Sequence, residues 1–204
     1  GLGVTPGLYW IKNREGAGED AWRVYHHNNT AAPETDFLIL NTTAATADNA
    51  GFTNDVAPTT SLISLGDDEE VNTDGEDYML YAWGEVQGFS KFGNYTGNGN
   101  ADGQFVFLGF RPATVIFKVT STTGSWLIVD NKRDPHNVAN HILIPSGSDA
   151  AITGNSSLYV DFLSNGFKIR GTNSSWNTNT ATYIYAAWAE APFVNSNGVP
   201  CNAR

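Results

Sequence analysis

The acidic segment between residues 67 and 77 has the residue types that come closest to a metal site. Its carboxylates include Asp67, Asp68, Glu70, Asp74 and Glu76. Carboxylate oxygens are preferred Ca²⁺ ligands, and carboxylates crowded together repel one another unless a cation lies between them. The spacing differs from that of an EF-hand, because Tyr81 stands where the bidentate glutamate belongs. The segment therefore predicts either a calcium site or a solvated acidic turn; no other cofactor is expected.

Trp176 is the candidate for ligand binding. It lies in the polar sequence Ser-Ser-Trp-Asn-Thr at residues 174–178, outside any strand pattern. An exposed tryptophan ring in a turn can stack on a sugar, whereas the same ring folded back over a sheet would fill the core. The sequence is compatible with both placements.

Two histidine pairs, His26 with His27 and His136 with His141, have side chains that can bind metal ions. Neither pair recurs at the equivalent place in the other half of the chain, and no Cys or acid completes a ligand set beside them. We therefore expect these histidines at the surface or in hydrogen bonds.

The elements that position these side chains are short. Runs rich in β-branched and aromatic residues alternate with Gly, Asn, Ser and Thr, and no long helical apolar rhythm is present. Strands are predicted at residues 8–12, 22–25, 37–40, 61–65, 78–83, 104–107, 114–119, 126–129, 141–144, 157–163, 167–170 and 182–188. This spacing is typical of an antiparallel sandwich or jelly roll.

The chain contains an internal duplication with a period of about 105 residues. The matched segments are residues 2–12 with 108–118, Trp22 with Trp126, residues 72–73 with 177–178, Tyr78 with Tyr183, and residues 82–85 with 187–190. The period is the size of one small sandwich. We therefore predict an all-β protein of two tandem antiparallel, jelly-roll-like β-sandwich repeats, residues 1–87 and 88–194, followed by a tail at residues 195–204.

Duplicated residues have structural explanations. Trp83 and Trp188 lie in apolar strands, and we expect each to fill the core of its own sandwich. Glu85 and Glu190 follow them and suggest a catalytic carboxylate pair, but glycosidases need two unlike carboxyl groups roughly 5 to 10 Å apart in one cleft. Equivalent positions in two different repeats do not meet that requirement, so no catalytic residues and no enzyme are predicted.

Residues 88–109 join the two repeats and predict a β-hairpin, because two strand-like runs flank a loop rich in Gly and Asn. The sequence begins near the position equivalent to Leu108, so the first repeat lacks this segment. We expect the edge of its sheet to be completed by upstream residues, completed by a neighbouring subunit, or left open. An open edge is a template for association.

Several motifs of the second repeat resemble a recurrent β-domain of bacteriophage virion proteins, mostly tail-fibre-like proteins of marine and freshwater phages. They are residues 95–99, 109–112, 161–168 and 183–190. The likeness covers residues 88–194 well and residues 2–86 loosely, where Ser-Leu-Ile-Ser at 61–64 replaces Gly-Phe-Lys-Ile at 166–169. The resemblance implies a non-enzymatic part of the virion surface, forming homotrimers and contacting other virion proteins. Its implied role is host-surface attachment as a tail-fibre or appendage module, or alternatively capsid decoration or a fibre shaft.

Net charge and the length of the apolar runs exclude two classes of partner. The net charge is −10, so phosphate would repel the chain and nucleic acid is not an expected partner. Residues 1–86 hold 15 acidic and three basic residues, whereas residues 87–204 hold six acidic and eight basic ones. No apolar run approaches the roughly 18 residues of a membrane helix, so membrane insertion is not expected. Exposed aromatic and amide side chains can bind sugars, so a host cell-surface glycan is a further candidate ligand.

Overall fold

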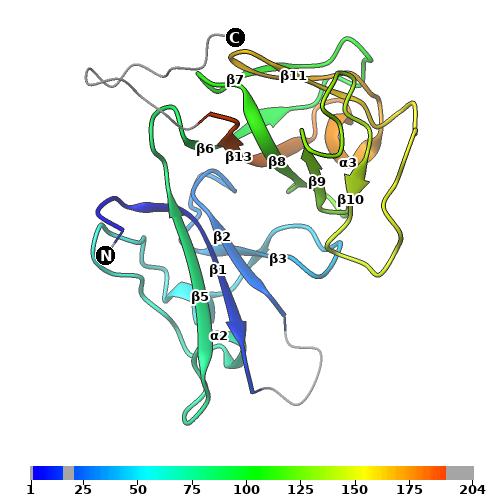
Figure 1. Ribbon diagram of the computed structural model, residues 1–204. Coiled ribbons are helices and arrows are strands. Elements are labelled where there is room, and N and C mark those ends of the chain that lie inside the picture. The colour runs from blue at the N-terminus through cyan, green and yellow to red at the C-terminus, as the bar shows by residue number, and fades with distance from the viewer. Residues whose placement is uncertain (1, 16–20, 192–204) are drawn as a thin grey trace.

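The computed structural model describes residues 2–15 and 21–191, which form an assembly of short antiparallel strands (Figure 1). This confirms the all-β, sandwich-like fold class. The predicted tail at residues 195–204 lies outside the described residues, as do residues 192–194. No helix within the described ranges has the length and apolar character that crossing a membrane requires.

The first sheet is formed by the N-terminal half and has the strand order β4-β3-β2-β1-β5. Its strands are β1 (Pro6–Asn13), β2 (Arg23–His26), β3 (Asp36–Ile39), β4 (Ala47–Asp48) and β5 (Tyr78–Gly84). Two single-turn helices, α1 (Ala50–Thr53) and α2 (Glu69–Asn72), pack on one face. The core between sheet and helices contains Tyr9, Ile11, Tyr25, Phe37, Phe52 and Val71.

The C-terminal half forms a second sheet with the order β10-β9-β8-β13-β6 and a third with the order β11-β12-β7. The second sheet contains β6 (Ser90–Thr96), β8 (Pro112–Val119), β9 (Leu127–Asp130), β10 (Ile142–Leu143) and β13 (Thr182–Ala189). The third contains β7 (Phe105–Phe107), β11 (Val160–Leu163) and β12 (Gly166–Ile169), and the helix α3 (Ser174–Asn177) lies nearby. One large core joins these elements, with Phe117, Phe167 and Trp176 near its centre.

The two halves share a further core, and this corrects one expectation. Leu8, Val24 and Leu38 of the first half join Phe92, Ile116, Trp126, Ile184 and Ala186 of the second half in one cluster. Trp83 and Trp188 border this shared core and contact each other edge-on, with ring centroids 6.0 Å apart. The prediction that each fills the core of its own half is therefore wrong, because both side chains point toward the other half.

The segment of residues 88–109 is not a β-hairpin. β6 pairs with β13 in the second sheet, whereas β7 pairs with β12 in the third. The intervening loop crosses from one sheet to the other, and its amides at Gly97, Gly99 and Gly103 donate to the carbonyls of Ala181, Asn177 and Ile169. The Gly and Asn residues form a turn-rich crossing rather than a hairpin loop. We call residues 88–109 the connecting arm.

The predicted strand at residues 61–65 is also absent. Its sequence counterpart, β12, is held as a strand by β11 on one side and β7 on the other. Within the described residues, no strand pairs with residues 61–65. Without partners for its N–H and C=O groups, a short apolar run does not become a strand.

The two halves nevertheless repeat several details. β3-β2-β1-β5 and β10-β9-β8-β13 have the same order, and the pairing of β1 with β5 shifts register beside Pro6 as that of β8 with β13 does beside Pro112. Gly3 and Gly109, three residues before these prolines, both have positive φ angles, 78° and 82°, which glycine adopts without steric cost. The duplicated sequence therefore encodes the same local backbone twice.

Candidate functional site

Trp176, the sequence candidate for sugar stacking, is fully buried. It lies in α3, packs edge-on against Phe117, and donates its indole N–H to the carbonyl of Ser157. Of the two placements that the sequence allowed, the structure has the one in which the ring is folded back over the sheet. The hypothesis that Trp176 binds a ligand at the surface is wrong.

The acidic segment is divided among several structural contacts. Asp68 caps α2 by accepting a hydrogen bond from the amide of Glu70, and it forms an ion pair with Arg23 at 2.9 Å. Glu70 accepts a hydrogen bond from the amide of Ala21. Glu76 accepts one from the side chain of Asn13.

Asp67 and Asp74, the other two candidates, flank α2 on either side. Among residues 2–15 and 21–191, no three His, Cys, Asp or Glu side chains are arranged to hold a metal ion. The calcium hypothesis therefore gains no geometric support, and the carboxylates beside α2 act as hydrogen-bond acceptors and ion-pair partners.

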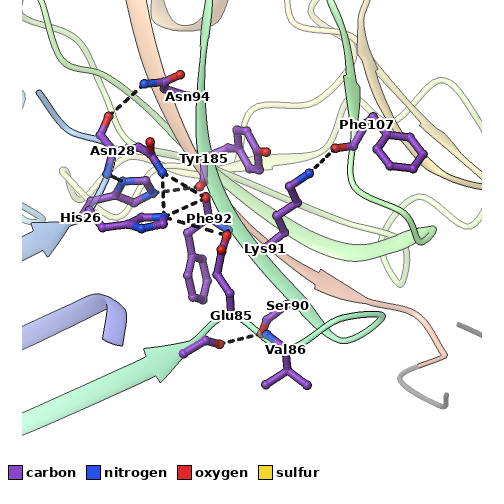
Figure 2. A network of polar contacts seen from close by, with 12 residues as sticks. His26, Asn28, Glu85, Val86, Ser90, Lys91, Phe92, Asn94, Phe107 and Tyr185 are labelled. Carbon is purple, nitrogen blue, oxygen red and sulfur yellow. Dashed lines mark hydrogen bonds and ion pairs between the residues drawn. The ribbon is translucent and has the colours of Figure 1, made fainter. Parts of the chain in front are cut away.

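Glu85 and Glu190 each serve a local contact. Figure 2 shows Glu85 accepting a hydrogen bond from the amide of Phe92 at 2.7 Å, which ties the end of β5 to β6. Glu190 pairs with Arg111 at 2.9 Å. Glu85 therefore links the two halves, whereas the Glu190–Arg111 ion pair lies within the second half.

The boundary between the halves contains a buried histidine. His26 donates from Nε2 to the carbonyl of Tyr185 at 3.0 Å, and its Nδ1 accepts from the amide of Asn28 at 3.1 Å (Figure 2). Burial lowers the pKa of His26 from 6.5 to about 3. A proton on Nδ1 would also face the Asn28 N–H, so the ring stays neutral and serves as a hydrogen-bonding link between the halves.

Lys118 is a second buried titratable group at this boundary. Its ammonium donates to the carbonyl of Gly124 at 2.7 Å and to that of Thr43, in the first half, at 3.3 Å. Burial lowers its pKa from 10.5 to about 8. Both buried groups therefore link the two halves through hydrogen bonds to backbone carbonyls.

The surface with the clearest binding character lies beside β5. Its apolar side chains come from the segment before β1, from the loop at residues 59–65 and from β5 itself. We call it the β5 surface, and its exposed members are Leu2, Val4, Leu62 and Leu80. Scattered exposed apolar residues are normal, but a contiguous apolar patch marks a contact site.

A groove of about 450 Å³ runs through this surface. Its walls are Leu2, Val4 and Pro6 on one side, residues 59–63 on another, and Leu80 with Ala82 of β5. β5 is one of the two edge strands of the first sheet (Figure 1), and within the described residues no strand pairs with its outer edge. An apolar groove therefore adjoins a strand edge that no strand of the described residues covers.

Fold and surface together define an all-β protein in which an apolar groove adjoins a strand edge that is unpaired within residues 2–15 and 21–191. The chain belongs to the family described as "Domain of unknown function (DUF7483)", whose family model matches residues 1–192. A search of curated proteins and a search of solved structures each returned no match.

Proposed function

We propose that this chain is a non-enzymatic structural module of a bacteriophage virion, and that it acts at the particle surface through contacts with other proteins. The β5 surface carries the proposal, because it combines exposed apolar side chains with an open strand edge. The phage assignment itself comes from the sequence motifs at residues 95–99, 109–112, 161–168 and 183–190.

Protein contact takes precedence over glycan attachment in this proposal. Trp176 was the residue singled out for sugar stacking, and its ring lies in the core. A fibre-shaft or capsid-decoration role uses apolar surface directly, since such a part packs against copies of itself or against other virion proteins. A homotrimer is the oligomer we propose, on the same resemblance.

The test is to locate the protein in intact particles. Purified particles from the phage that encodes the chain are labelled with an antibody and imaged by electron microscopy, while the purified chain is assayed for binding to virion proteins and to host lipopolysaccharide. We expect label on the particle and binding to virion proteins. Absence from the particle would refute the virion role, and binding to lipopolysaccharide alone would replace assembly by host attachment.

A further inference from the structure

Equivalent apolar positions are buried in the second half and exposed in the first. In the second half, Leu108, Phe110, Phe167 and Tyr185 are each exposed by 6% or less. Their counterparts in the first half are Leu2, Val4, Leu62 and Leu80, each exposed by 37% or more. The first four are buried in the core that the connecting arm helps to form through Tyr95 and Val106. The β5 surface is therefore the first half's version of a site that a polypeptide segment already occupies in the second half.

The strand pairing of β5 and β13 shows the same difference between the halves. β13 pairs with β8 on one side and with β6 on the other, over the register from Thr182 opposite Thr96 to Trp188 opposite Ser90. β5 pairs with β1 in the manner of β13 with β8, and its other edge has no strand in the described residues. A strand can therefore pair with β5 in the same antiparallel sense.

A polar anchor is retained as well. In the second half, the buried side chain of Asn177 binds the arm, accepting from the amide of Asn98 at 2.9 Å and donating to the carbonyl of Asn100 at 2.7 Å. It also donates to the carbonyl of Gly171. Its counterpart Asn72 keeps the equivalent bond, to Gly66, but is exposed rather than buried. Asn72 is therefore positioned to meet the backbone of an incoming segment.

We propose that the open edge of β5, the groove beside it and Asn72 bind an extended strand of a different protein, in the register in which β6 binds β13. The inference rests on the proposed function and names the contact through which that function operates. Main-chain hydrogen bonds supply affinity in this mode of recognition, and alternate side chains entering pockets supply specificity.

The chemistry of the occupant follows from β6 and from the groove. The acidic excess of residues 1–86 favours a neutral or basic strand, as β6 is, with Lys91 its only charged residue. Opposite Tyr185, β6 carries Gly93, where a Cβ atom would lie 2.5 Å from the tyrosine hydroxyl. The counterpart of Tyr185 is the shorter Leu80, which borders the groove. The occupant therefore carries an apolar side chain at this position, directed into the groove.

The binding experiment uses a capped synthetic peptide of residues 88–100 and the full chain. Amide hydrogen exchange is followed at residues 78–84, with residues 182–189 as the internal reference because both edges of β13 are paired. At a peptide concentration about ten times its dissociation constant, exchange in β5 should slow roughly tenfold while β13 is unchanged. A peptide with Gly93→Leu should bind about fivefold more tightly, because the added side chain leaves water.

Chain variants provide the controls. Leu80→Lys should abolish binding, Asn72→Ala should weaken it several-fold, and Leu143→Lys, on the similarly exposed edge strand β10, should leave it unchanged. Thermal unfolding of each variant confirms that it folds. Unaltered hydrogen exchange in β5 at the highest soluble concentration of both peptides would overturn the strand site. A dimer that forms without peptide and protects β5 from exchange would also overturn it, because a second copy of the chain would then be the occupant. Neither result affects whether the protein is found on the particle, so the two proposals fail separately.

Discussion

The turn before the last strand is built identically in the two halves, whereas the surfaces beside that strand differ. Tyr78 accepts from the amide of Thr73 at 2.8 Å and donates to the carbonyl of Glu69 at 2.7 Å. Tyr183 makes the same two bonds, at the same distances, to Thr178 and Ser174. This motif lies within ten residues of chain and survives sequence divergence. Burial of Leu80 or Tyr185, by contrast, depends on whether a distant segment adds a strand.

The largest expected effect on the free energy of unfolding is in α3, and it exceeds the effect of the matched change in α2. Trp176→Ala should lower the free energy of unfolding by about 3 to 5 kcal/mol, because it leaves a large cavity in the main core of the second half. Val71→Ala, at the equivalent buried place in α2, should cost about 2 kcal/mol, since fewer carbon atoms are lost. Urea denaturation measures both. Equal losses of unfolding free energy would mean that Trp176 and Val71 stabilise their cores to the same extent.

Acid should weaken the contact between the halves. In the unfolded chain His26 takes up a proton below pH 6.5, whereas in the folded chain its pKa is about 3. Stability from this site is therefore complete above pH 6.5 and is lost as the pH falls toward 3, by about 2 kcal/mol between pH 7 and 5. The measurement is the unfolding free energy across this range for the wild type and for His26→Gln. Parallel curves for the two proteins would contradict the neutral, buried histidine.

The hydroxyl of the shared tyrosine should contribute more to the free energy of unfolding in the second half than in the first. Tyr183 is fully buried, so Tyr183→Phe leaves the amide of Thr178 without its acceptor and should cost about 1 to 3 kcal/mol. Tyr78 is only half buried, so water can replace its hydroxyl and Tyr78→Phe should cost less than about 1 kcal/mol. Thermal unfolding of the two single variants provides the comparison. A larger loss from Tyr78→Phe would reverse our interpretation of the two environments.

The smallest expected effect is at the open edge. Leu80→Ser should change the free energy of unfolding by no more than about 0.5 kcal/mol, because the side chain is already exposed. Tyr185→Ser, its buried counterpart, should cost about 3 kcal/mol or more. The matched pair is measured by denaturation of the isolated chain. A large loss from Leu80→Ser would show that the β5 surface already packs against another part of the chain.

Most strands could be predicted from the sequence, because period-two runs bounded by Gly, Asn and Ser are local signals. Eleven of the twelve predicted runs overlap observed strands, and residues 61–65 do not. That run has the composition of a strand but no neighbour to pair with. The connecting arm shows the same limit, since its two strands were recognisable while their partners, β13 and β12, lie far along the sequence.

The sites were less predictable than the fold. Trp176 stands in a polar sequence that resembles an exposed turn, yet α3 folds its ring into the core, where Phe117 and the Ser157 carbonyl contact it. The carboxylates near residue 70 share a short stretch of chain, but capping and ion pairing direct Asp68 and Glu70 toward different partners. Side-chain direction depends on packing against elements that sequence spacing does not specify.

The amino-acid sequence by itself determined the strand-rich composition, the duplicated turn with its tyrosine, and the charge difference between the halves. These properties depend on residues close together in the chain. Only the tertiary structure decided that Trp83 and Trp188 meet in a shared core, that His26 is buried between the halves, and that no strand of the described residues pairs with the outer edge of β5. The reason is that burial and strand pairing are relations between distant segments, and a repeated sequence acquires different surroundings wherever its neighbours differ.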